Sequence, residues 1–310
     1  MLRTVLAGAA GSILTFALLS LQSAAPRTLP VGLTPEKIEI LSHMKVIYLD
    51  DGAGGQAKTI QFEGVNVQVV GGVGTPTGLG NLIIGYNADT GSTPTRTGSH
   101  NLILGSDNSY TGEGGIVAGR DNSIGTAGVI LGGHSNQAGD GVVLSGHNNT
   151  AGIQGVVLTG VENRALWGSA VATGWRNEAE DSAVILSGRD NYAEDSAVVV
   201  GGLNNTAASD YSAILGGADN TTPWTLEPGK DWSGAIGSCI VGGKLNTVDG
   251  YDTVVVGGES NNAGGLRSVV LGGKDNWTIW SGPTSVVAGG LAHGASGEHD
   301  FVAGSLFEDQ

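Results

Sequence analysis

Two pairs of carboxylates recur fourteen residues apart. Glu180 and Asp181 form the first pair, and Glu194 and Asp195 occupy the same places in an almost identical context. If successive coils stack at strand spacing, like charges lie about 5 Å apart. Carboxylate oxygens are ligands that Ca²⁺ prefers, so the four side chains form a candidate Ca²⁺ site. A solvated acidic edge is the other interpretation.

Tryptophans form a second group with chemical potential. Aromatic side chains on the turns of an exposed protein can stack on sugar rings or anchor a protein partner. They can also cover the corners where loops fold back. Two irregular stretches, residues 221–231 and 277–283, interrupt the pattern of the chain, and insertions of this kind lie on one face of a repeat protein. The predicted binding surface contains Trp224, Trp232, Trp277 and Trp280.

Enzymatic and cofactor signatures are weak. His134 and His147 share one slot and could form a metal site or a pH-sensitive pair, but their column offers no third ligand, which favours exposed turn histidines. Cys239 lies in an apolar triplet, which is typical of core rather than of a nucleophile. Gly-rich dipeptides are so frequent that they carry no phosphate-binding information. We therefore predict no catalytic residue, no cofactor apart from the candidate Ca²⁺, and no enzymatic activity.

An asparagine marks a repeat whose intervals are mostly 13 to 15 residues. The one large departure is an interval of 26 residues after Asn220, and His293 continues the register seventeen residues after Asn276. The repeat asparagines are Asn108, Asn122, Asn136, Asn149, Asn163, Asn177, Asn191, Asn205, Asn220, Asn246, Asn261 and Asn276.

Each period also carries a small apolar residue, a turn, three apolar residues and a glycine corner. Val129, Ile130 and Leu131, followed by Gly132 and Gly133, are one example. So short a period predicts a β-solenoid whose coils stack about 4.8 Å apart. Glycine at the corner supplies a positive φ or a close approach, and the asparagine column either hydrogen-bonds from coil to coil or occupies the left-handed region.

The apolar triplet predicts self-association. In a half-buried strand the middle residue would be polar, yet it is Ile130, Val143 and Val157 in successive coils, so the strand is apolar on both faces. A fourteen-residue coil is too thin to bury both faces within one chain. The outward row would expose more apolar surface than a monomer normally does, and cyclic association of copies would cover it.

These repeat units resemble the heads of YadA-like trimeric autotransporter adhesins. The resemblance rests on the Asn-x-Ala step, the turn, the apolar triplet and the glycine corner, as in residues 177–188 and 262–273, and it covers residues 79–307. It implies a left-handed parallel β-roll in which three chains pack along their apolar strands. The sequence departs from that family because it has no heptad stalk and no C-terminal set of membrane strands, so a barrel-anchored adhesin is not expected.

Three segments follow from this pattern. Residues 1–25 have the basic start, apolar stretch and small-residue end of a signal peptide. Residues 26–78 contain a short helix that begins after Thr34, and a small β segment with strands expected at 46–49, 59–62 and 65–70. Residues 79–310 form the repeat domain. The predicted fold is therefore all-β: a parallel β-solenoid of about 14-residue coils, preceded by a short helix and a small β segment.

Composition limits the function classes. The chain has 310 residues, 55 of them Gly, one Cys and a net charge of −15. The charge argues against nucleic acid or an anionic membrane surface as partner, and one Cys excludes a disulfide framework. We expect a secreted or surface-displayed homotrimer that acts as an adhesive or structural module on an extracellular protein or glycan ligand, without membrane insertion of the mature chain. The alternative is a carbohydrate-active β-helix enzyme, a polysaccharide lyase or hydrolase; a phage-like fibre tip is a third possibility that the signal peptide disfavours.

Overall fold

The computed structural model describes residues 33–72, 77–86, 94–223 and 235–304. The chain divides into two compact units, Met1–Gln68 and Val69–Gln310. The division falls ten residues before the boundary expected from the sequence at 78/79. The predicted signal peptide, residues 1–25, lies outside the described residues.

The N-terminal unit contains a helix and a hairpin. Helix α2 (Pro35–Ser42) begins after Thr34, whose side-chain hydroxyl accepts a hydrogen bond from the backbone N–H of Lys37 at 3.4 Å. Strands β1 (Met44–Asp50) and β2 (Gln56–Phe62) pair antiparallel. The helix and the strands at 46–49 and 59–62 were predicted, whereas their antiparallel pairing was not. The strand predicted at 65–70 is wrong, because no strand lies beside this segment to complete its hydrogen bonds, although its residues alternate in polarity.

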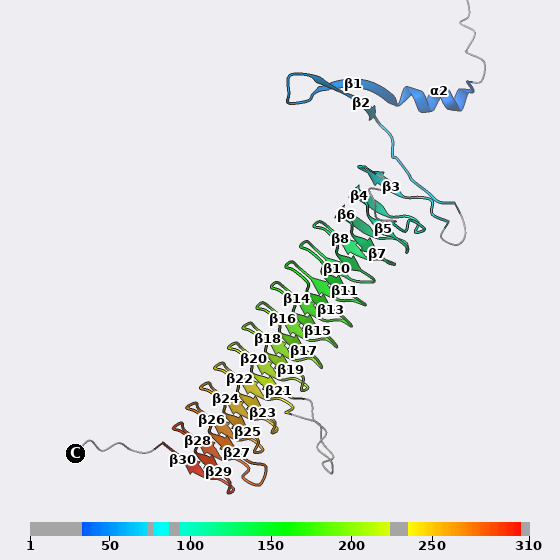
Figure 1. Cartoon of the computed structure of the whole chain (residues 1–310). Coiled ribbons are helices and arrows are strands. Elements are labelled where there is room, and N and C mark those ends of the chain that lie inside the picture. Colours follow the sequence, from blue (N-terminus) through cyan, green and yellow to red (C-terminus); the bar gives the residue numbers. More distant parts are fainter. Residues whose placement is uncertain (1–32, 73–76, 87–93, 224–234, 305–310) are drawn as a thin grey trace, which may run out of the picture. The chain divides into compact units, whose positions relative to one another are not determined.

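The second unit is a parallel β-solenoid, as predicted (Figure 1). Within the described ranges its strands form a 15-stranded sheet, called here the long sheet, and a 13-stranded sheet, called the short sheet. The long sheet contains β3 (Leu82–Ile84), β4 (Leu102–Ser106), β6 (Ile116–Arg120), β8 (Val129–Ile130), β10 (Val142–Val143), β12 (Val156–Val157), β14 (Ala170–Val171), β16 (Val184–Ile185), β18 (Val198–Val199), β20 (Ala213–Ile214), β22 (Cys239–Ile240), β24 (Val254–Val255), β26 (Val269–Val270), β28 (Val286–Val287) and β30 (Phe301–Val302).

Each coil alternates between the two sheets, so strands one repeat apart pair in parallel and in register. The short sheet contains β5 (Ser109–Tyr110), β7 (Ser123–Ile124), β9 (Gln137–Ala138), β11 (Thr150–Ala151), β13 (Arg164–Ala165), β15 (Glu178–Ala179), β17 (Tyr192–Ala193), β19 (Thr206–Ala207), β21 (Thr221–Thr222), β23 (Thr247–Val248), β25 (Asn262–Ala263), β27 (Trp277–Thr278) and β29 (Gly294–Ala295). A third row of single bridges, from Arg120↔His134 to Lys274↔Leu291, closes the coil between the sheets.

The core is a narrow column between the sheets. Ile130, Val143 and Val157 from the long sheet and Ala138 and Ala151 from the short sheet have no exposed surface. The middle residue of each triplet therefore points inward. The prediction that this residue forms the outward row is wrong: side chains alternate along a strand, so when the middle residue enters the core, the two flanking residues face outward.

The repeat asparagines hold neighbouring coils together. The side-chain oxygen of Asn136 accepts the backbone N–H of Asn149 at 3.0 Å, and the Asn149 amide nitrogen donates to the carbonyl of Gly160 at 2.9 Å. The ladder runs from Asn108 and ends where His293 donates its backbone N–H to Asn276. Of the two predicted roles, hydrogen bonding between coils is confirmed. The left-handed conformation belongs to the preceding residue, as at Asn148, where φ is 54°.

Candidate functional site

The outward side of the long sheet is a continuous apolar stripe. The residue that ends each triplet is a large aliphatic side chain in most coils, and Leu131 is 52 % exposed. From β4 to β28 the residue that begins each triplet, such as Val142 or Val156, is half-buried and points the same way. We call these two columns the apolar stripe. Its exposed members from β4 to β28 are Leu131, Leu144, Leu158, Leu186, Leu215, Val241, Val256 and Leu271.

The stripe differs from the scattered apolar residues of an ordinary surface. Parallel pairing in register places each side chain directly beside the next, as Val142 stands beside Val129 and Val156. Fifteen strands at the usual spacing extend over about 65 Å. A soluble monomer rarely exposes a contiguous apolar patch of this extent, so the stripe is a candidate interface. Cys239 belongs to it: its side chain faces outward rather than into the core as predicted, and partial burial raises its thiol pKa.

The carboxylates singled out in the sequence lie on adjacent coils. Glu180 and Glu194 follow the paired short-sheet strands β15 and β17, and Asp181 and Asp195 occupy left-handed turn positions with φ of 45° and 51°. The chain thus brings the four residues together as two stacked pairs.

Charge crowding alters the ionisation of two of these acids. Partial burial, reinforced by Glu178 and Glu194 and opposed by Arg164, raises the pKa of Glu180. Partial burial raises the pKa of Asp195 as well, and neighbouring Asp210, Glu194 and Asp181 add to the effect. A carboxylate column without enough cations holds its protons more tightly than free acids do.

The geometry does not supply a metal cage. Among the described residues, no group of three or more His, Cys, Asp or Glu side chains is arranged to hold a metal ion. Glu180 instead lies 3.7 Å from the guanidinium of Arg164, which also pairs with Glu178. Tyr192 donates its hydroxyl to Glu194 at 2.6 Å. The Ca²⁺ site at Glu180, Asp181, Glu194 and Asp195 stays a prediction.

The predicted tryptophan surface is described in part. Trp224 and Trp232 lie outside the described residues. Trp280 lies in a turn and is 43 % exposed, as its place in the sequence indicates. Trp277 is not in a turn as predicted: it begins strand β27 of the short sheet and points outward, because it occupies the slot before the inward residue of the repeat. Its indole ring lies against the α-carbon of Gly294 on the next coil.

An edge of rings and cations runs along the third row. The rings of His134 and His147 stack with centroids 4.1 Å apart, which confirms their shared slot. Further along, Trp175 lies 4.5 Å from the guanidinium of Arg176 and 5.3 Å from that of Arg189, and it donates to Glu162 at 3.2 Å. Sequence reasoning missed this cluster, although its signal was present: these residues occupy the two slots before the repeat asparagine.

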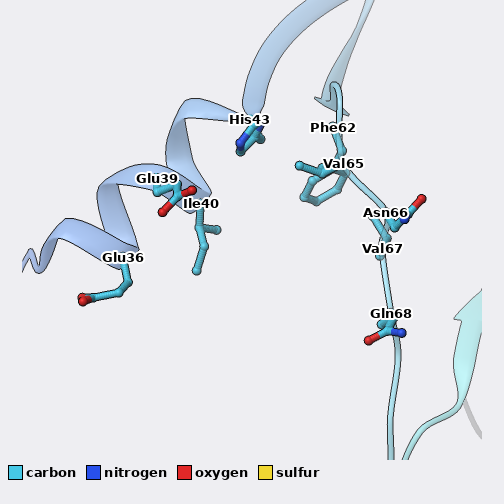
Figure 2. Close-up of a pocket in the computed structure, with 9 residues that line it drawn as sticks. All are labelled: Glu36, Glu39, Ile40, His43, Phe62, Val65, Asn66, Val67 and Gln68. Carbon is cyan, nitrogen blue, oxygen red and sulfur yellow. The ribbon is translucent and has the colours of Figure 1, made fainter.

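The N-terminal unit contains a groove of about 610 Å³. Glu36, Glu39 and Ile40 of α2, with His43 just after it, line one side, and Phe62 and residues 65–68 line the other (Figure 2). No residue predicted to be functional from the sequence lies in it.

Comparison of the chain with protein-family models and with curated proteins finds no match. No helix in the described part of the chain is long and apolar enough to cross a membrane. The fold therefore defines the class, a parallel β-solenoid repeat protein. The outward faces of its long and short sheets are the surfaces on which its function can rest.

Proposed function

We propose that this chain is a secreted or surface-displayed homotrimer, similar to YadA-like adhesin heads, that serves as an adhesive or structural module. The observation that carries the proposal is the apolar stripe. Its side chains, such as Leu144 and Leu158, stand in register along the whole long sheet, and burying them against copies of the same stripe removes apolar area from water at about 25 cal/mol per Å². In a cyclic assembly the apolar stripe of every copy is covered to the same extent.

The proposal gives different roles to different surfaces. The long sheet holds the copies together, while the short sheet and the turns remain exposed for a ligand. Export fits the predicted signal peptide at residues 1–25. No catalytic group is needed for this role, and we propose that the protein is not an enzyme.

Sedimentation equilibrium of the purified chain tests the assembly. We expect a species of three chains that persists on dilution, because an interface of this length holds the chains together tightly. A stable monomer would overturn it. Antibody labelling of intact cells against lysed cells tests the location, with labelling of intact cells expected.

A carbohydrate-active enzyme is the second candidate, and one observation favours it. Glycosidases use a pair of carboxylates, one of them a general acid with a raised pKa, and Glu180, whose pKa is raised by partial burial, lies one coil from Glu194. Glu180→Gln and Glu194→Gln, assayed on acidic and neutral polysaccharides, test this alternative. It requires measurable activity in the unchanged chain and its loss in both variants.

A further inference from the structure

The outward side of the short sheet differs chemically from the apolar stripe. One side chain per coil points outward there, in the slot before the buried small residue. From β17 to β27 this slot holds hydroxyl, amide and aromatic side chains and no charged one. The six residues are Tyr192, Thr206, Thr221, Thr247, Asn262 and Trp277, and we call them the polar track.

The track is straight because its members pair in strict register. Thr206 stands beside Thr221, and Thr221 stands beside Thr247 on parallel strands. Five strand spacings separate Tyr192 from Trp277, which is about 24 Å. A linear row of short polar groups with an aromatic ring at each end matches an extended polymer rather than a compact ligand.

Trp277 has the geometry of a stacking platform. Its indole ring lies against Gly294, the next residue in the same column, where any other side chain would collide with the ring. The ring is thereby held against the sheet, and 40 % of the residue remains exposed. A partly exposed indole ring whose movement the sheet restricts is suited to stacking on a sugar ring.

Asn262 supplies an unmet hydrogen-bond acceptor beside the indole. Its side-chain oxygen has no partner within the described part of the chain, although it is shielded from solvent. Buried acceptors normally find a donor. Rotation of the Asn262 side chain would bring its oxygen to the surface, where a ligand hydroxyl can donate a hydrogen bond to it. Thr247, one coil earlier, adds a hydroxyl that both donates and accepts.

We propose that the polar track binds an extended, neutral glycan, with one sugar stacked on Trp277 and the following sugars along Asn262 and the threonines. The ligand is neutral because Glu194 and Asp249 flank the track and the chain carries a net charge of −15, so an anionic glycan is repelled. This inference rests on the proposed adhesive function and names its ligand class.

Calorimetric titration of the full chain tests the track. The probes are hexasaccharides of β-1,4-linked glucose and of β-1,4-linked N-acetylglucosamine, compared with a hexasaccharide of galacturonic acid. We expect binding to a neutral probe and at least tenfold weaker binding to the acidic one. Absence of binding to both neutral probes at millimolar concentration, or preference for the acidic probe, would overturn the inference.

Substitutions locate the site. Trp277→Ala should weaken binding at least tenfold, and Gly294→Ala should do so while keeping the indole, because the new methyl group displaces the ring. Thr247→Val, which keeps the shape of the side chain, should weaken binding several-fold. Trp175→Ala, an exposed tryptophan in the third row of bridges and outside the track, is the matched control and should change affinity less than twofold. Unchanged affinity in both Trp277→Ala and Thr247→Val would overturn the assignment.

The oligomeric state separates this inference from the proposed function. Each variant is sedimented alongside the unchanged chain. Loss of glycan binding with an unchanged trimer leaves the assembly intact and tests the track alone, whereas a monomer that still binds the neutral glycan contradicts the assembly and supports the track.

Discussion

The side-chain oxygen of Asn163 accepts two hydrogen bonds from Asn177, one from the backbone N–H and one from the amide nitrogen, both at 3.1 Å. The residues are one coil apart and fully shielded from solvent. The Asn177 amide nitrogen also donates to the carbonyls of Gly188 and Thr173. One side chain thus satisfies backbone groups of its own coil and of the next coil, and also donates to the asparagine side chain of the preceding coil.

Removing one member of the asparagine ladder should destabilise the solenoid strongly. Asn177→Ala leaves the backbone N–H of Asn191 without its acceptor and the carbonyl of Thr173 without its donor, at a place shielded from solvent. We expect a loss of about 2–4 kcal/mol in the free energy of unfolding, measured by urea denaturation. Asn148→Gly is the control, because Asn148 is exposed and left-handed; it should be neutral or slightly stabilising. Equal effects of the two changes would contradict the ladder's role.

The two glycines of a corner should differ in how much stability the chain loses when each is replaced by alanine. Gly217 has φ of 90°, and a Cβ there would collide with Asn220 and with the backbone of Gly243. Gly216 has open space around it and no positive φ. Gly217→Ala should therefore prevent folding or lower the thermal midpoint by many degrees, whereas Gly216→Ala should stay within about 0.5 kcal/mol of the unchanged chain. Circular dichroism melts compare them, and tolerance of Gly217→Ala would refute the corner geometry.

Lowering the pH should relieve the repulsion among the stacked carboxylates around Glu180 and so stabilise the fold there. The pKa of Glu180 is higher in the folded chain than in the unfolded one, so the folded state binds more protons between these two values. Stability from this group is present below the unfolded pKa and falls as the pH rises through the folded pKa. Glu180→Gln should raise the urea midpoint at pH 7 and reduce its change between acidic and neutral pH.

Asp190 provides the opposite case as a control. Hydrogen bonds from Arg176 hold its pKa below the ordinary value, so its contribution is present at neutral pH and lost as the pH falls through the folded pKa. Asp190→Asn should lower stability at pH 7. If the two variants Glu180→Gln and Asp190→Asn changed the pH dependence of stability in the same direction, the opposite pKa shifts of the two acids would be contradicted.

The periodic part of the fold was predictable because it repeats. Asn, glycine and apolar slots recur, so a single interpretation of one coil applies to all, and Asn122 and Asn261 occupy equivalent places. The orientation of the triplet was not predictable from polarity alone, since all three residues are apolar. Only the stacking of Ile130 against Ala138 across the thin core decides which one points inward.

The candidate sites were less predictable because they depend on whether a repeat position lies on a sheet or in a turn, and on which side chains of neighbouring coils surround it. Trp277 resembles a turn residue in a stretch that departs from the period, yet register with Asn262 places it on the short sheet. The carboxylate pairs were placed correctly on adjacent coils, but Arg164 comes from the coil before them and takes up part of their charge. Such neighbours emerge only when coils are stacked.

The most direct test of the account is the native mass of the purified chain beside that of Leu158→Lys. Leu158 lies in the middle of the apolar stripe and is 43 % exposed, so a charge there should disrupt assembly without unfolding the coil. Thr206→Lys on the short sheet is the matched control. We predict three times the chain mass for the unchanged chain and for Thr206→Lys, and a monomer for Leu158→Lys. A monomeric unchanged chain, or a trimer that survives Leu158→Lys, would contradict the account.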